Sequence, residues 1–113
     1  MDKDIPLERR LNITAGETRL GATQAALELK EGSYPPVVYV PRADVDMTLL
    51  VKTNHQTTCP HKGPCSYYAV KTPQGLLENA VWSYEAPIPG MEQITGHLAV
   101  SPDKVTLAYT VAI

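Results

Sequence analysis

Ten prolines and seven glycines are spread along this chain of 113 residues. Because proline ends helices and glycine favours turns, such spacing leaves room for short strands and little room for long helices. The length suits a single hydrophobic core. We therefore predict a mainly β protein with one or two short helices, in which residues 11–113 form one domain after a flexible N-terminal segment, residues 1–10.

Several segments alternate apolar and polar side chains with the period of a half-buried strand. The predicted strands cover residues 11–14, 22–30, 37–40, 49–53, 97–100 and 105–113, together with a hairpin of 67–72 and 76–85. In the second hairpin strand, strict alternation would place Trp82 and Tyr84 on one face and Asn79 on the other. In the last strand, the residues expected to face the core are Val105, Leu107, Tyr109 and Val111.

Two segments are expected to carry the short helical turns. Residues 42–50 are interpreted as a short turn that leads into the strand 49–53. Residues 89–96 have Pro89 near the first helical turn and Gly96 just past the last, which is the usual asymmetry of helix ends. We predict about two turns of helix there.

The first ten residues are charged and lack the apolar stretch of a secretory signal, and no apolar run approaches the roughly eighteen residues that would span a bilayer. We expect a soluble cytoplasmic protein whose two cysteines are thiols, and no membrane partner. The formal charge is −2 and the basic residues are scattered. This distribution argues against nucleic acid as the main partner, and the sequence leaves the oligomeric state open.

The stretch TTCPHKGPCSYY, residues 57–68, concentrates residue types that bind metals or attack substrates. With the histidine just before it, it offers four side chains that zinc accepts: His55, Cys59, His61 and Cys65. Their spacing does not match paired zinc knuckles, and the prolines at positions 60 and 64 limit how the segment bends. We therefore predict no metal and no cofactor, with a solvated turn as the simpler interpretation.

Cys59 has a second interpretation as a reactive thiol. It lies two positions from His61 and three from Lys62, and neighbouring cations favour the thiolate. The alternative is that Cys59 is a small buried apolar side chain. A disulfide with Cys65 is disfavoured by the expected reducing compartment.

Gly32-Ser33, followed by Asp44-x-Asp46, formally resembles the signature of metal-dependent nucleotidyltransferases, in which paired carboxylates hold Mg²⁺. In those enzymes a helix fills the gap between the two halves. Here Pro35 and Pro36 prevent a helix from starting, and residues 37–40 favour a strand. The alternative is that Asp44 caps a short turn.

The segment around Trp82 and Tyr84 favours either a core anchor or the aromatic wall of a ligand pocket. In the second case Tyr39, Tyr67, Arg42 and Lys62 would supply the polar groups. The chain contains no G-x-S-x-G elbow and no P-loop motif.

Three ordered motifs, within residues 34–50, 57–70 and 78–100, make the chain similar to a small, mostly bacterial family known as domain of unknown function 427. The resemblance covers about residues 12–109 and implies a compact, mostly antiparallel β domain of the β-tent type, which is shared with zinc-carrying methionine-R-sulfoxide reductases. It implies no established reaction. The family is also filed as nucleotidyltransferase-like.

The matching positions in the three motifs are Tyr39, Pro41, Asp44, Val45, Cys59, Pro60, Lys62, Gly63, Asn79, Trp82, Tyr84 and Pro87. This chain departs from the family pattern where Val40 replaces an aromatic residue, Thr58 a histidine, His61 an aromatic residue and Cys65 an alanine. Since His61 and Cys65 are half of the supposed zinc set, these departures disfavour a shared zinc site.

We combine these observations into a candidate pocket that binds a small anionic or planar ligand. Its predicted residues are Arg42, Asp44, Cys59, Lys62, Tyr67, Trp82 and Tyr84. Arg42 and Lys62 would hold an anionic group of the ligand, and the rings would cover its planar part. The candidate catalytic residues are Cys59 and Lys62. The alternatives are a thiol- or metal-dependent enzyme, including a nucleotidyltransferase-like one, and an interaction module without a ligand.

Overall fold

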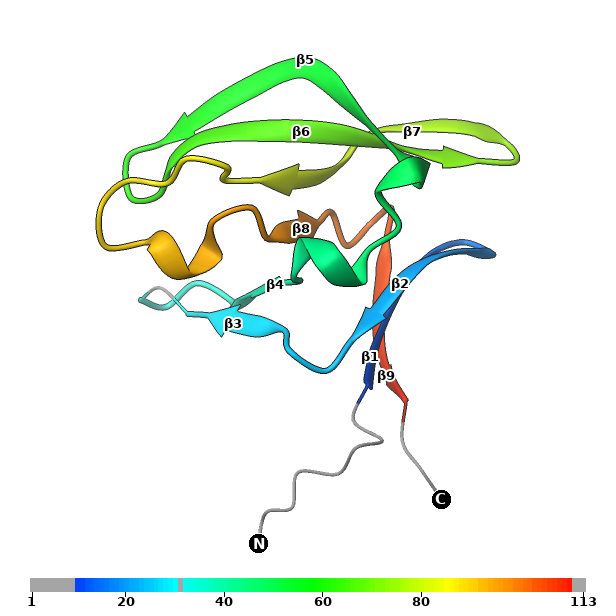
Figure 1. The fold of residues 1–113 in the computed structure, drawn as a ribbon, viewed down its shortest axis with the longest axis horizontal. Helices are drawn as coiled ribbons and strands as arrows, with labels where there is room; N and C mark the ends of the chain where they lie inside the picture. Colours follow the sequence, from blue (N-terminus) through cyan, green and yellow to red (C-terminus); the bar gives the residue numbers. More distant parts are fainter. Residues whose placement is uncertain (1–9, 31, 111–113) are drawn as a thin grey trace, which may run out of the picture.

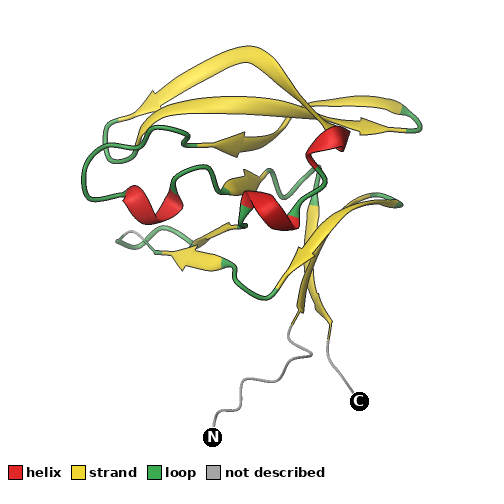
Figure 2. Ribbon diagram, in the orientation of Figure 1, coloured by secondary structure: helices red, strands yellow, loops and turns green. Residues whose placement is uncertain are grey.

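The computed structural model describes residues 10–30 and 32–110. Over these residues the chain forms nine strands and three single-turn 3₁₀ helices (Figure 1). Figure 2 shows how strongly strands dominate, which confirms the predicted mainly β class. Of the N-terminal segment predicted to be flexible, residues 1–9 lie outside the described residues, and Arg10 begins the first strand.

The strands form three antiparallel sheets. One contains β2 (Thr18–Thr23), β1 (Arg10–Ala15) and β9 (Thr106–Thr110), in that order. A second pairs β3 (Leu27–Leu29) with β4 (Val37–Tyr39). The largest has the order β5 (Leu50–Cys59), β6 (Gly63–Thr72), β7 (Gly75–Ser83) and β8 (Leu98–Val100). Reciprocal 2.8 Å hydrogen bonds between Val40 and Leu98 join the second sheet to the largest.

The helical elements are η1 (Arg42–Asp44), η2 (Met47–Leu49) and η3 (Glu92–Ile94). The first two confirm the short turn before β5. The two-turn helix predicted for residues 89–96 is wrong, since the segment contains only η3. Gly90 and Gly96 both adopt positive φ, at 98° and 72°, so the left-handed backbone at each end restricts helical geometry to the residues between them. Within the described residues, no helix is long and apolar enough to cross a membrane.

Two predicted strands differ from the structure. The strand predicted over residues 22–30 is broken, because the buried Thr23 ends β2 and its hydroxyl accepts a 2.9 Å hydrogen bond from the Ala25 amide. Val105, just before β9, and Leu107 within it pack on the core, but Tyr109 is 54% exposed and the prediction for it is wrong. Within the described residues β9 pairs only with β1, so few side chains pack over its C-terminal end. Val111 lies outside the described residues.

The largest sheet contains two register shifts. Between β5 and β6, three residues of β5, residues 53–55, oppose the single residue Tyr67. Between β6 and β7, residues 78–80 oppose the single residue Ala69, and Asn79 adopts a φ of 53°. The strict alternation predicted for β7 is therefore wrong across the bulge, where Ala80 and Val81 are buried in succession, but Trp82 and Tyr84 do share one face.

Neighbouring residues of the same strands belong to two different core clusters. The first contains Tyr68, Val70, Val81 and Leu98 and packs against the sheet of β1. The second contains Tyr39, Cys65, Tyr84, Ile94 and Ala99. Since successive residues of a strand point to opposite faces, the two clusters lie on opposite faces of β4, β6, β7 and β8.

Candidate functional site

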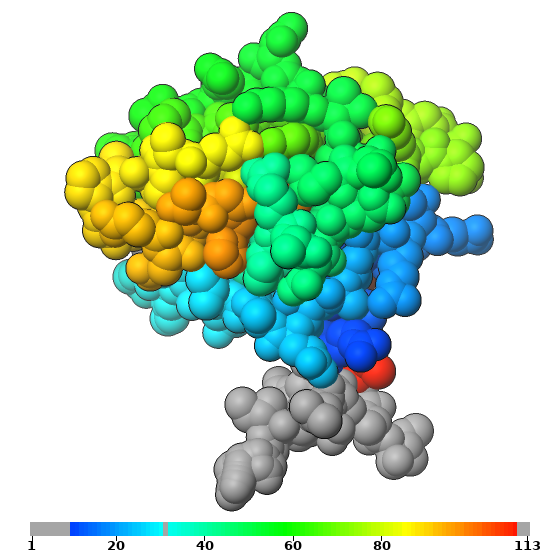
Figure 3. Space-filling view, in the orientation of Figure 1, coloured from blue at the N-terminus to red at the C-terminus, as the bar shows by residue number. Residues whose placement is uncertain are grey.

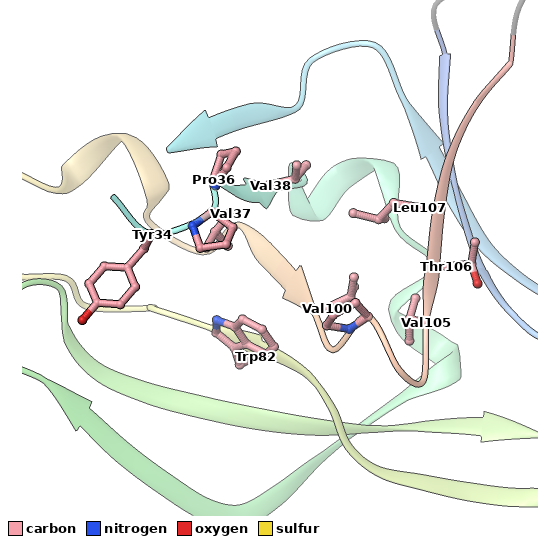
Figure 4. Close-up of a pocket in the computed structure, with 11 residues that line it drawn as sticks. Tyr34, Pro36, Val37, Val38, Trp82, Val100, Val105, Thr106 and Leu107 are labelled. Carbon is pink, nitrogen blue, oxygen red and sulfur yellow. The ribbon is translucent and has the colours of Figure 1, made fainter. Parts of the chain in front are cut away.

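An apolar pocket with a volume of about 630 Å³ lies between β4, β7 and the segment that joins β8 to β9. Trp82 comes from β7, residues 34–38 form a second wall, and Val100, Val105 and Leu107 belong to the third (Figure 4). Small-molecule sites in proteins commonly have volumes of about 300–1,000 Å³ and mostly apolar walls. The size and lining of this pocket therefore fall within the range of small-molecule sites.

The local sequence explains why these walls hold their shape. Pro35 and Pro36 fix the backbone just before the short strand β4, and this segment faces Trp82 across the pocket. Trp82 is only half-buried. A large aromatic side chain beside an open volume offers a flat apolar surface to a ligand.

Of the seven residues predicted to form one pocket, only Trp82 lines this one. The structure does bring four of the seven together, because Cys59, Tyr67 and Trp82 pack around the second core cluster that contains Tyr84. Arg42 and Asp44 lie elsewhere, beside Glu85 and Thr23 respectively. Tyr39 is buried inside the second cluster.

Arg42 is the centre of a polar cluster that we define as Arg42, Lys52, Tyr68, Ser83 and Glu85. Its guanidinium donates to the Gly96 carbonyl at 3.0 Å, to the Tyr68 hydroxyl and Ser83 Oγ at 3.3 Å each, and to Glu85 Oε2 at 3.0 Å. It also lies 5.7 Å from the centre of the Tyr68 ring. On the face shown in Figure 3, the segment that carries Arg42 borders the one that follows β7. Arg42 therefore ties η1 to β6, β7 and the loop before β8.

The Glu85 carboxylate accepts hydrogen bonds from Arg42, from Tyr68, and from Lys52 at 2.9 Å. Burial alone would raise the pKa of Glu85, but the bonds from Tyr68 and Lys52 and the charges of Lys52 and Arg42 lower it to about 2. Glu85 raises the pKa of Lys52 in return. A carboxylate held this strongly in its charged form is a poor proton acceptor at neutral pH. The polar cluster therefore has a structural role and holds the elements around it together.

Asp44 lies on the other side of η1 and is exposed. Its carboxylate accepts a 2.7 Å hydrogen bond from the Thr23 hydroxyl, and its carbonyl lies close to Gly21. A Cβ at Gly21 would lie only 2.1 Å from that carbonyl oxygen, so β2 and η1 pack closely at this point. Asp44 thus fastens η1 to β2. Asp46, at the other end of the Asp-x-Asp pattern, caps η2 by accepting from the Thr48 amide at 3.0 Å.

The turn between β5 and β6 contains Lys62, which is buried with 7% of its surface exposed. Its amide donates to the Cys59 carbonyl at 3.1 Å, and its carbonyl accepts from the Ile88 amide at 2.9 Å. Gly63 follows with a φ of 116°, and a Cβ there would come within 3.1–3.3 Å of the backbone of residues 86–88. The turn therefore packs on the 86–88 segment and does not cover the apolar pocket.

The two thiols are free and differ in their surroundings. Cys59 is half-buried at the end of β5, and Cys65 is buried in β6. Burial raises the pKa of the Cys65 thiol, and it also raises the pKa of the Tyr84 phenol beside it. Both groups are held in their neutral forms, which favours a packing role for Cys65. The nucleophilic role of Cys59 stays a prediction.

The four candidate zinc ligands do not converge. Cys65 is buried in the second core cluster, while the His55 ring lies 4.5 Å from the Tyr67 ring and His61 is exposed in the turn. Within residues 10–30 and 32–110, no group of three or more His, Cys, Asp or Glu side chains is placed to hold a metal ion.

Sequence reasoning missed most of the pocket wall and most of the polar cluster. The double proline after Tyr34 was a usable signal, because consecutive prolines make a stiff exposed wall. Val100, Val105 and Leu107 gave no signal, since their pattern is that of ordinary core residues. Glu85 and Lys52, 33 residues apart in sequence, meet only in the folded chain.

The sequence profile of a family described as Domain of unknown function (DUF427) matches residues 5–111. This match confirms the resemblance seen in the three motifs. No curated protein matches the chain.

Proposed function

The chain belongs to the family described as Domain of unknown function (DUF427), and since that description assigns no activity, we propose from the site itself that the protein binds a small, uncharged, planar ligand in the apolar pocket. The observation that supports this proposal best is the half-buried Trp82 beside a volume of about 630 Å³. A planar ring that packs on the indole would remove apolar surface of both partners from water.

The composition of the walls favours an uncharged ligand over an anionic one. The cations expected to hold an anion, Arg42 and Lys62, are not among the residues that line the pocket. Arg42 already donates to four other groups. Valine, leucine and proline side chains in the walls supply no hydrogen bond to replace the hydration of an anion, so a charge there would be poorly solvated.

Trp82 is the single tryptophan of the chain, so its fluorescence reports directly on the pocket. We expect 1-naphthylamine, an uncharged planar compound, to bind at one saturable site, to change the Trp82 emission and to raise the unfolding temperature. Inorganic phosphate, added as a competitor, should not displace it. The measurements are fluorescence titration, calorimetry and thermal unfolding of the wild-type protein.

Two results would contradict this function. One is the absence of saturable binding by calorimetry. The other is saturable binding that leaves the Trp82 emission unchanged, because a ligand stacked on the indole must alter its surroundings. Displacement by phosphate would instead favour the anion-binding alternative.

A further inference from the structure

Three ring side chains form a row across the largest sheet, and we call His55, Tyr67 and Trp82 the aromatic row. They belong to the neighbouring strands β5, β6 and β7. The His55 and Tyr67 ring centres are 4.5 Å apart, and those of Tyr67 and Trp82 are 6.5 Å apart. Tyr67 and Trp82 are direct partners in the β6–β7 ladder, so both side chains point to the same face.

The β5–β6 ladder brings His55 to the Tyr67 ring. After the bulge the strands pair Gln56 with Ser66, and the preceding position in this register sets His55 opposite Tyr67, where the two rings contact. The Thr53 hydroxyl lies 3.1 Å from the Asn79 side-chain oxygen, to which it donates, and this bond links the two bulges. Asn79 keeps a φ of 53°, a conformation that non-glycine residues seldom adopt.

A second contact fixes the middle ring of the row. The hydroxyls of Tyr67 and Thr57 share a hydrogen bond of 3.0 Å. Tyr67 is half-buried and His55 is exposed. The row therefore runs from the pocket, where Trp82 forms one wall, to the solvent at β5, and its rings are held before any ligand arrives.

We propose that the aromatic row is a second subsite of the apolar pocket, and that the ligand is a molecule of two linked planar rings. This proposal rests on the proposed function. The inner ring packs on Trp82 inside the pocket, and the outer ring passes over Tyr67 toward His55. Because the outer end is exposed, the outer ring tolerates polar substituents, whereas the inner ring is apolar.

The experiment uses two probes that differ by one ring, 1-naphthylamine and N-phenyl-1-naphthylamine. Contact between aromatic rings contributes roughly 0.5–1.5 kcal/mol, which corresponds to a change in affinity of about two- to tenfold. We expect N-phenyl-1-naphthylamine to bind more tightly than 1-naphthylamine by about that factor. The variant His55→Ala should weaken only the two-ring probe, and Tyr67→Phe, which keeps the ring, should bind both probes as the wild type does.

His61→Ala is the matched control, since His61 is an exposed histidine of the same hairpin outside the aromatic row. It should leave both affinities unchanged, and circular dichroism should show the same fold for every variant. If His55→Ala binds both probes as tightly as the wild type does, the second subsite is wrong while the pocket stands. If neither probe binds the wild type, the pocket and the second subsite fail together.

Discussion

Trp82 and Ser83 are neighbours on β7, and they belong to two regions of opposite character. Trp82 lines the apolar pocket, where the walls carry few polar groups. Ser83 is fully buried on the other face and joins the polar cluster, where Arg42 alone donates to four groups. The difference teaches that a charged residue indicates a binding site only when its donor or acceptor groups are not already bonded to other groups of the protein.

The two regions also depend on different energies. The polar cluster shields its charged groups only partly from water, with the Arg42 and Glu85 side chains 34% and 32% exposed, and it gives each a partner, so its net contribution is small while it stays complete. Removing one partner leaves the others unsatisfied. The apolar pocket has the opposite property, because its walls expose apolar surface that a bound ligand covers, and such a ligand stabilises the folded protein.

Arg42→Ala is expected to have the largest effect. It removes the donor shared by Tyr68, Ser83, Glu85 and the Gly96 carbonyl, and the free energy of unfolding should fall by about 2–3 kcal/mol. Urea unfolding measures this loss. Binding of 1-naphthylamine should change less than twofold, since Arg42 does not line the pocket.

Lys52→Ala is the control for this change, because Lys52 also pairs with Glu85 but is 51% exposed. Its effect on unfolding should be much smaller than that of Arg42→Ala. If Arg42→Ala keeps the free energy of unfolding of the wild type but no longer binds 1-naphthylamine, this interpretation is wrong. Arg42 would then belong to the binding site.

Val38→Phe should give the next largest effect, on binding. Val38 lines the pocket, and a phenyl ring in its place occupies the volume that the probe needs. We expect the affinity for 1-naphthylamine to fall at least about tenfold, equivalent to roughly 1.4 kcal/mol.

The matched control is Val51→Phe, at a valine of β5 that is 38% exposed and does not line the pocket. Its affinity should equal that of the wild type. Equal affinity in both variants would show that the probe binds somewhere else.

The smallest effect concerns the pH dependence of stability through Glu85. The pKa of Glu85 is lowered in the folded protein to about 2 from its ordinary value of 4.5. Its carboxylate therefore stabilises the fold above pH 4.5, and this contribution is lost as the pH falls from 4.5 toward 2. Glu85→Gln has no carboxylate at this position, so its free energy of unfolding should fall less than that of the wild type over this pH range.

Urea midpoints measured at about pH 5 and about pH 2.5 give the difference between the two proteins. Glu92 and Asp103, whose pKa values are also lowered, remain in both proteins, so their share cancels in the comparison. Parallel loss of stability in wild type and variant would mean that Glu85 does not hold the polar cluster together.

Local patterns predicted the elements best where only local forces act. The hairpin of β6 and β7, the end of β4 before Pro41 and the turns before β5 follow from alternation and from proline geometry. The predictions failed where neighbours decided the outcome. Thr23 at the end of β2 donates to the distant Asp44 carboxylate, and Asn79 in the β7 bulge accepts from Thr53 of β5, contacts that no period in the sequence shows.

The predicted site failed to assemble as one pocket for a related reason. Arg42 and Asp44 are separated by one residue, yet η1 turns Arg42 toward Glu85 and Asp44 toward Thr23. Cys59, Tyr67 and Trp82 did come together, because alternate residues of paired strands share a face. Adjacency in the sequence is a poor guide to a site wherever a turn lies between the residues.

The sequence by itself determined the mainly β class, most of the strands and the family, because alternation, turn residues and ordered motifs are local properties. Only the tertiary structure decided which conspicuous residues remain available for a ligand. The reason is physical, since the availability of a charge or a ring depends on the partners that distant strands bring to it. For Arg42 those partners use its donors, and for Trp82 they leave one side open.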